Sequence, residues 1–352
     1  MEPSVDSATA VVASPRQRIA LVADRAVRSR YFVWDWGEAI AIQALIVASG
    51  AIGEPRFGQW ASSRLDLWRQ IHPDPFWPDH LGPGVALVWH YVRTGEPEIL
   101  EYAERVGRHL ASLPKATTGA RLLRPDKPDL ETFVWVDSLY SDGPFLCELG
   151  RVTGNDEYFN EGASQTEGIC ASVQHPASGL FAHRYDDATE TTNGVFWGRG
   201  CGWAALGLGH TLAALPRTHP AWNTLAHRLQ RFAATAATLQ SSSGHWNAIL
   251  DRPDTRLESS TTALIGEGLA LGIDAAALSE EYRNTVERAW SAVATEVAPD
   301  GRVENVSQRS PSSTAWEDYA KLPHGGCYAW GQGPWLIFAC RFLPDDGDEG
   351  TM

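Results

Sequence analysis

Six apolar stretches of one kind recur along the chain, each rich in Ala, Gly and Leu and almost free of charged residues. They begin at residues 33, 81, 135, 198, 259 and 331, so consecutive starts are 48 to 72 residues apart. Helices of this composition have no polar side and are expected to be buried all round. Charged amphipathic segments such as EPEILEYAERVGRHLASL, which begins at residue 96, alternate with them. The pattern predicts an array of helical hairpins, each with one buried and one partly solvated helix.

Six such hairpins close an (α/α)6 toroid, so we predict an all-α fold with a single (α/α)6 barrel over residues 30–343. An open superhelix is the alternative. The sixth stretch is as apolar as the others and lacks the polar face that the end of a solenoid needs, which favours closure. Residues 1–29 are predicted to form an N-terminal extension with the first outer helix, and residues 344–352 a disordered acidic tail.

The charge balance bears on the partners of the chain. With 43 acidic and 29 basic residues the formal net charge is −14, which argues against a nucleic-acid or anionic-membrane surface. No apolar run is long enough for a membrane span or resembles the core of a signal peptide. The five scattered cysteines, without CxxC pairs, indicate reduced thiols and a cytoplasmic location. We expect a monomer or a homodimer.

Aromatic and polar residues gather where the predicted inner helices begin. They are Trp34, Asp35 and Trp36 at the first; Trp77, Asp79 and His80 at the second; Trp135 and Asp137 at the third; Trp197, Arg199 and Trp203 at the fourth, with His183 before it; and His324, Tyr328 and Trp330 at the sixth. Equivalent turns of a toroid meet at one end of the ring. Carboxylates, a histidine, an arginine and aromatic faces at that end describe a crater that binds a sugar.

Asp137 and Asp79 are the candidate catalytic residues. Either could instead be an N-cap, a position that Asp favours. The neighbours Trp135 and Tyr140 are expected to desolvate Asp137 and raise its pKa, as suits a proton donor. Two carboxylates from adjacent inner helices resemble the pair that glycosidases use, with Asp35 as a third candidate. No metal-ligand spacing, P-loop, GxSxG or dinucleotide fingerprint occurs, so we expect neither a metal nor a cofactor.

The ordered motifs resemble the unsaturated glycuronyl hydrolases of glycoside hydrolase families 88 and 105, and are most similar to the unsaturated rhamnogalacturonyl hydrolases of family 105. The resemblance runs from about residue 30 to 340 and rests on these motifs: WDWGEAI, VWVDSLY, PFLCELGRVTGNDEY, GLFAHRYD, FWGRGCGWA, LQSSSGHWNAILD, LESSTTAL and GQGPWL. It implies an (α/α)6 barrel without a required metal. It also implies removal of a 4,5-unsaturated uronic acid from the non-reducing end of oligosaccharides that polysaccharide lyases release.

The resemblance further implies a hydration reaction. A carboxylic acid protonates the C4=C5 enol ether at C4, water adds at C5, and the resulting hemiketal opens and expels the remaining sugar. Asp137 would donate the proton and guide the water, with Asp79 as the second carboxylate.

The other motif residues would then form the pocket. His183 and Arg199 would line it, with Arg199 as the partner of the substrate carboxylate. Trp197 and Trp203 would flank the sugar ring, Trp36 would stand on the opposite wall, and Trp135 would also contact the substrate. The glycines of GRGCGW would let the backbone approach the sugar. Cys201 stands where the family usually has Asn.

Two other classes of function stay open from the sequence. One is another (α/α)6 sugar enzyme, either an epimerase or an inverting glycosidase. The other is a catalytically inactive sugar-binding barrel. The aspartates in the motifs argue against both, because an epimerase would be expected to rely on paired histidines and an inactive barrel would not need the acids.

Overall fold

The computed structural model describes residues 14–29, 36–74, 84–122 and 124–344. Twelve helices alternate along these segments between an inner and an outer position. The inner helices are α2 (Trp36–Ala51), α4 (Gly84–Thr94), α7 (Gly143–Thr153), α9 (Gly198–Ala214), α11 (Ser259–Asp274) and α14 (Ala329–Arg341). The outer helices are α1 (Pro15–Arg28), α3 (Pro55–Ile71), α5 (Pro97–Ser112), α8 (Asp156–Val173), α10 (Trp222–Leu239) and α12 (Arg283–Val293). Short elements complete them: α6 (Ser138–Ser141), η2 (Glu280–Tyr282) and α13 (Trp316–Ala320).

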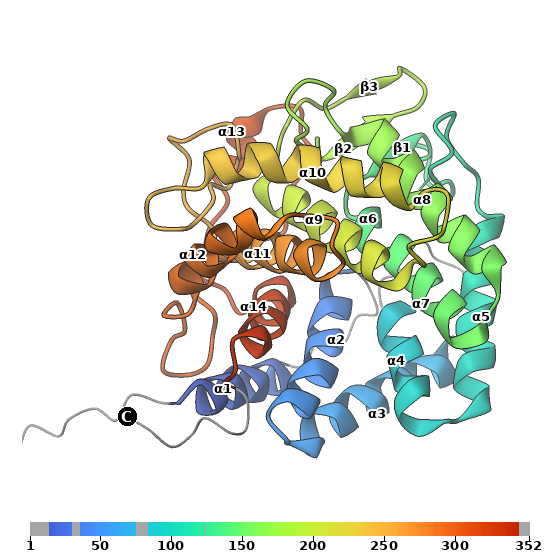
Figure 1. Ribbon diagram of the computed structural model, residues 1–352, viewed down its shortest axis with the longest axis horizontal. Coiled ribbons are helices and arrows are strands. Elements are labelled where there is room, and N and C mark those ends of the chain that lie inside the picture. The colour runs from blue at the N-terminus through green and yellow to red at the C-terminus, as the bar shows by residue number, and fades with distance from the viewer. Residues whose placement is uncertain (1–13, 30–35, 75–83, 123, 345–352) are drawn as a thin grey trace, which may run out of the picture.

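The inner helices form a closed ring. Each packs against the next, and the last, α14, packs against the first, α2 (Figure 1). The backbones come close at this junction, since a Cβ on Gly333 would lie 2.8 Å from the carbonyl oxygen of Ile40. The outer helix α1 covers the same junction, where Gln332 donates to the carbonyl of Val22. The (α/α)6 toroid predicted from the repeat is therefore confirmed, and the open superhelix is excluded.

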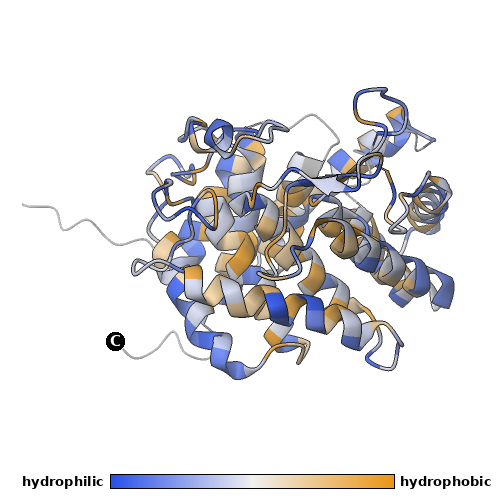
Figure 2. Ribbon diagram, turned by 90° about the horizontal axis from the view of Figure 1, so that it is seen from above, coloured by the Kyte–Doolittle hydropathy of each residue, from blue (hydrophilic) through white to orange (hydrophobic). Residues whose placement is uncertain are grey.

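Burial explains why the two kinds of helix differ in composition. In α9, every residue from 198 to 209 is buried. Helix α5 instead buries one stripe at helical spacing, which consists of Ile99, Tyr102, Ala103, Val106, Gly107 and Leu110. Hydrophobic residues accordingly gather toward the middle of the molecule and hydrophilic ones toward the outer helices and loops (Figure 2). No helix among the described residues is long and apolar enough to cross a membrane.

Glycines set the spacing between α9 and α11. A Cβ on Gly268 of α11 would lie 2.4 Å from the carbonyl carbon of Ala205, and one on Gly209 of α9 would lie 2.8 Å from the Gly268 oxygen. Glycine inside a helix costs up to about 1 kcal/mol relative to alanine. Here it permits a close approach of two backbones that no other residue allows.

A small antiparallel sheet lies at the end of the barrel where α9 begins. It contains β1 (Phe133–Trp135), β2 (Arg184–Asp186) and β3 (Thr191–Thr192), in that order. Trp135 is paired with Arg184, and the ladder continues one step further, since Val136 N–H donates to the His183 carbonyl at 3.0 Å. The hairpin that β2 and β3 form lies at the same edge of the molecule as α13 (Figure 1). The sheet thus brings the segment after β1 beside the segment before β2.

Candidate functional site

Asp137 follows β1 and occupies the N-cap position of α6, but its side chain accepts no capping hydrogen bond. The carboxylate is 15% exposed. Its Oδ2 atom is buried and has no hydrogen-bond partner among the described residues. A buried carboxylate oxygen without a partner is costly, so such an atom in a folded protein points to a functional role.

His183 faces this carboxylate. The ladder between β1 and β2 sets the two residues side by side, and His183 Nε2 lies 3.6 Å from Asp137 Oδ2. The other ring nitrogen, Nδ1, is 2.7 Å from the hydroxyl of Tyr319 in α13. The imidazole is only 3% exposed. One nitrogen is therefore held by the protein core, and the other is turned to the acid.

Three aromatic rings enclose the imidazole. The centroid of Trp135 lies 5.0 Å away with its plane nearly perpendicular, that of Trp197 lies 4.6 Å away, and that of Tyr319 lies 5.5 Å away. Rings packed at such distances and angles restrict the orientation of the imidazole. The indole Nε1 of Trp135 is buried without a hydrogen-bond partner among the described residues. It is a second polar atom at the site that the protein leaves unpaired.

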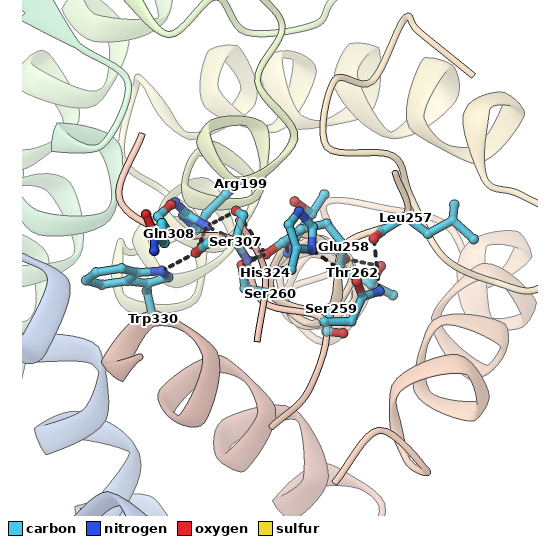
Figure 3. A network of polar contacts seen from close by, with 12 residues as sticks. Arg199, Leu257, Glu258, Ser259, Ser260, Thr262, Ser307, Gln308, His324 and Trp330 are labelled. Carbon is cyan, nitrogen blue, oxygen red and sulfur yellow. Dashed lines mark hydrogen bonds and ion pairs between the residues drawn. The ribbon is translucent and has the colours of Figure 1, made fainter. Parts of the chain in front are cut away.

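Arg199, in the first turn of α9, lies behind Trp197. Its guanidinium carbon is 4.6 Å from the centroid of the Trp197 ring and 5.5 Å from that of Trp330. Nη1 donates to Ser307 Oγ at 2.7 Å and Nη2 to the Gln308 carbonyl at 2.8 Å (Figure 3). Nε is buried and has no partner in the part of the chain that the structure describes. The side chain is 0% exposed. Two of its three nitrogens are thus used to hold the 307–308 backbone.

Glu258, the N-cap of α11, balances the charge of Arg199. Its Oε1 lies 3.6 Å from Arg199 Nη1, and both side chains are buried. The carboxylate also accepts from Ser260 Oγ, from Thr261 N–H and from Ser307 N–H. The network joins the starts of α9 and α11 to the segment that leads into α14 (Figure 3).

Both side chains of this ion pair have a pKa that differs from its ordinary value. Burial lowers the pKa of Arg199 to about 10, against the opposing effect of Glu258, so Arg199 is charged at neutral pH. Burial alone would raise the pKa of Glu258. The Arg199 charge and the backbone hydrogen bonds from Ser307 and Thr261 outweigh it and hold that pKa below its ordinary value.

Trp203 lies one turn deeper in α9 and is 0% exposed. Its ring packs at 4.9 Å on the ring of Tyr140, whose hydroxyl donates to Gln43 Oε1 at 2.7 Å. In this arrangement Trp203 belongs to the core beneath the site. The predicted contacts of Trp203 and Arg199 with a substrate stay predictions.

The glycines of GRGCGW are packed against protein, which corrects the expectation that they bring the backbone to a sugar. A Cβ on Gly198 would lie 2.4 Å from the Asn247 carbonyl oxygen, and one on Gly202 would lie 2.6 Å from Leu264. Cys201 is likewise 0% exposed, and its thiol donates to the Phe181 carbonyl at 3.2 Å. Its side chain fills the core and does not line the site.

Several predicted residues lie outside the part of the chain that the structure describes. They are Trp34, Asp35, Trp77, Asp79, His80 and the side chain of Trp36. Of the predicted site residues, the structure therefore brings together Asp137, His183, Trp135 and Trp197, and it places Arg199 and Trp203 behind them. His324 and Tyr328 make other contacts. His324 Nδ1 is hydrogen-bonded to Asn305 Oδ1 at 3.0 Å, and the ring of Tyr328 stacks on that of Trp330.

Sequence reasoning missed three residues of this site, namely Glu258, Ser307 and Tyr319. Glu258 is the second residue of the motif LESSTTAL, directly before the apolar helix, and a carboxylate at such a place can accept from the free N–H groups of the first turn. Ser307 lies in a loop and Tyr319 in the short helix α13, and neither segment carries a motif. No pattern in the sequence could have marked them.

Comparison with known proteins shows the family to which the chain belongs. The model of Glycosyl Hydrolase Family 88 matches residues 18–344. The chain belongs to this family and is a glycoside hydrolase. It is 27% identical over 340 residues, 93% of its length and 95% of the relative's, to the unsaturated rhamnogalacturonyl hydrolase YesR of Bacillus subtilis. It is 32% identical over 176 residues, 48% of its length and 42% of the relative's, to an unsaturated 3S-rhamnoglycuronyl hydrolase of Alteromonas.

Solved structures agree on the fold. A possible member of family GH105 from Salmonella enterica superposes with a TM-score of 0.84 at 17% identity and covers 97% of this chain and 99% of its own. The unsaturated glucuronyl hydrolase of Bacillus sp. GL1 superposes with a TM-score of 0.74 at 14% identity, over 95% of this chain and 97% of its own. The resemblance read from the motifs is therefore confirmed.

Proposed function

We propose that this enzyme removes a 4,5-unsaturated uronic acid from the non-reducing end of oligosaccharides by hydrating its C4=C5 double bond. The observation that carries the proposal is the Asp137 carboxylate, with its buried, unpaired Oδ2 atom 3.6 Å from His183 Nε2. The names of the relatives YesR and the Alteromonas enzyme support the substrate class.

Asp137 would act first as the acid and then as the base. Its proton goes to C4, and the positive charge that develops at C5 and O5 is stabilised by the carboxylate left behind. The same carboxylate then takes a proton from the water that adds to C5. The C5 hemiketal opens to a ketone, and the hemiacetal at C1 collapses and releases the second sugar with its own oxygen.

The other site residues would place the unsaturated ring. Trp135 would offer its unpaired Nε1–H to a sugar oxygen, and the aromatic faces of Trp135 and Trp197 would form a wall. Asp79 as second carboxylate and Trp36 as the opposite wall belong to the proposal. Arg199 and Trp203 are fully buried and would support the site from behind. Contact of Arg199 with the substrate carboxylate also belongs to the proposal, and it requires that the buried Nε–H, which has no acceptor among the described residues, becomes accessible.

The test uses unsaturated disaccharides from lyase digests of pectin, of glycosaminoglycans and of related polysaccharides. Loss of the ultraviolet absorbance of the double bond is followed for the wild type and for Asp137→Asn. We expect kcat to fall by about 10²–10⁴-fold in the variant, the usual contribution of a positioned acid or base. Asp254→Asn, in an exposed loop outside the motifs, is the matched control and should keep its activity. No loss of absorbance with any wild-type digest would contradict the proposal.

A saturated disaccharide of the same linkage separates the mechanisms. Hydration requires the double bond, so the saturated analogue should remain intact. An inverting glycosidase attacks the anomeric carbon and would cleave both compounds. An epimerase would leave the glycosidic linkage in place, and an inactive barrel would change neither compound.

The setting of the reaction is also part of the proposal. We infer a cytoplasmic enzyme that acts as a monomer or homodimer on small lyase products without a metal or cofactor. None of the five cysteines, all of which the structure describes, is in a disulfide. Three of them, Cys147, Cys170 and Cys201, are buried in the core. This use of cysteine supports a reducing compartment.

A further inference from the structure

Tyr319 contacts the candidate catalytic pair from a distant part of the sequence. It lies in α13, 136 residues after His183, and its hydroxyl is 2.7 Å from His183 Nδ1. The side chain is 1% exposed. We propose that Tyr319 is a positioning residue: its hydroxyl donates to His183 Nδ1, holds the neutral imidazole in its Nε2–H tautomer, and so directs an N–H group at Asp137 Oδ2. The inference rests on the proposed function for its catalytic consequence.

The distances around the hydroxyl favour this direction of donation. Tyr319 has one proton and two acceptors within reach, His183 Nδ1 at 2.7 Å and the Ser313 carbonyl at 3.2 Å. A separation of 2.7 Å is the usual distance for a hydroxyl donor and the short end of the range of about 2.7–3.2 Å for N–H donors. The Ser313 carbonyl accepts from Asn193 Nδ2 at 2.8 Å, so it keeps a hydrogen bond when the Tyr319 hydroxyl donates to His183. The hydroxyl proton therefore lies in the shorter contact, the one to His183 Nδ1.

Asn193 fixes the phenol oxygen from the other side. Its Nδ2 donates to the Tyr319 oxygen at 3.2 Å as well as to Ser313, and its Oδ1 accepts from the backbone N–H of Arg184 and of Val195 at 3.4 Å. Each polar atom of this arrangement has a defined partner. The amide donates to Tyr319, and Tyr319 in turn donates to His183, so the chain of hydrogen bonds has one direction.

The contact of the other ring nitrogen, Nε2, supports the same tautomer. His183 Nε2 is the nitrogen that faces Asp137 Oδ2, and that oxygen has no other partner among the described residues. When Asp137 is ionised, as it is after it has protonated the substrate, an N–H group there is attracted to the carboxylate, whereas a bare ring nitrogen would set two lone pairs against each other. Burial also raises the pKa of Tyr319, which keeps its hydroxyl protonated and able to donate. An N–H group at this place stabilises the Asp137 carboxylate that remains after proton transfer to the substrate.

The tautomer can be measured without substrate. In protein labelled with ¹⁵N-histidine, the two ring nitrogens of a neutral imidazole have distinct chemical shifts when one carries hydrogen. A His183→Asn variant identifies the signals of His183 among the eleven histidines. In alkaline buffer we expect hydrogen on Nε2 and a bare Nδ1 in the wild type. Hydrogen on Nδ1 would overturn the inference, and the measurement needs only the wild type and a folded His183→Asn protein that serves to assign the signals.

Tyr319→Phe removes the hydroxyl and keeps the ring. We expect the tautomer population of His183 to shift and kcat to fall about ten-fold or more, a part of the roughly 10²–10⁴-fold that a positioned acid contributes, with KM nearly unchanged. Tyr102→Phe is the matched control, because it deletes a buried hydroxyl that donates to the His72 carbonyl in the outer layer. It should change neither the tautomer nor kcat.

The variant separates positioning from mere packing. An unchanged tautomer in folded Tyr319→Phe would overturn the inference even if kcat fell, and an unchanged kcat would overturn its catalytic part. The proposed function and the positioning role of Tyr319 can also be refuted separately. A wild type with the Nε2–H tautomer but without activity on any unsaturated disaccharide would refute the proposed function and leave the positioning by Tyr319 standing.

Discussion

Arg121 and Asp142 form an ion pair from which solvent is excluded: Arg121 Nε lies 2.6 Å from Asp142 Oδ2, and both side chains are 0% exposed. Arg121 Nη2 also donates to Asp142 Oδ1 at 2.6 Å. The pair ties the segment after α5 to the junction of α6 and α7, five residues after Asp137. A pair of this kind is costly to break, because the remaining charge stays in the core without a partner.

The buried pair predicts a large effect for one conservative change. Asp142→Asn leaves the Arg121 charge buried and should reduce the free energy of unfolding by about 3–5 kcal/mol. The measurement is urea unfolding followed by circular dichroism. Arg151→Gln, which removes an exposed i,i+3 pair with Glu148, is the control and should cost at most about 1 kcal/mol. Equal effects of the two variants would contradict the burial argument.

A second prediction concerns Glu258. Glu258→Gln removes the counter-charge of buried Arg199 and should also cost about 3–5 kcal/mol in the free energy of unfolding. Glu304→Gln, at a residue whose side chain is 52% exposed, is the control. A loss of activity in Glu258→Gln without any loss of stability would instead place Glu258 in the chemistry.

The same carboxylate predicts a dependence on pH. The pKa of Glu258 is lower in the folded protein than its ordinary value, which in an unfolded chain is about 4.3. Its stabilisation is therefore complete above that value and is lost as the pH falls through the lower folded pKa. The difference in unfolding free energy between the wild type and Glu258→Gln should narrow in this acidic range. A constant difference across the range would contradict the assignment.

Glycine packing between α9 and α11 gives a third prediction. In Gly268→Ala the new Cβ would lie 2.4 Å from the backbone of Ala205, so the helices must move apart, at a cost of about 1–3 kcal/mol or more. Gly50→Ala is the control, because nothing lies within 4 Å of its Cβ, and it should stabilise α2 by up to about 1 kcal/mol. Thermal unfolding would show shifts of opposite sign. A stabilised Gly268→Ala variant would refute the close approach.

Cys201 gives a fourth prediction. Burial raises the pKa of its thiol to about 12, so native Cys201 should resist alkylation by iodoacetamide and should react once urea unfolds the chain. Mass spectrometry of the Cys201 peptide measures both states. Cys201→Ala should keep its activity because the side chain packs in the core. A folded Cys201→Ala enzyme with a much reduced kcat would contradict this position.

Several starts of inner helices could be predicted, because a helix that is buried on all sides has a distinct composition. The third was wrong: the stretch expected from residue 135 begins with the end of β1 and with α6, and the inner helix α7 begins only at Gly143. The stretches expected from residues 198 and 259 begin as helices at those residues, and the one expected from residue 331 begins at Ala329. The outer helices showed the stripe that a half-buried surface requires. A repeat of this length therefore carries the topology in its sequence.

The partners of the site residues could not be predicted. Arg199 is held by the Gln308 carbonyl, 109 residues away, and every residue has a carbonyl. Tyr319 reaches His183 only because the small sheet and α13 lie at the same edge of the barrel. The sequence motifs identify which side chains carry charge or a ring. The motifs do not show whether such a side chain packs against the protein or faces the substrate. That depends on loops whose sequences have no periodicity.

The closure of the inner ring has a consequence for synthesis of the chain on the ribosome. The first inner helix, α2, packs against the last, α14, and α1 covers their junction. Until residues 329–341 have left the exit tunnel, the side of α2 that packs against α14 stays uncovered. Assembly of the barrel therefore has to wait for the final hairpin, and such late, long-range pairing is slow and exposed to aggregation. Ribosome-bound chains that stop before α14 should need chaperones that the finished protein can do without.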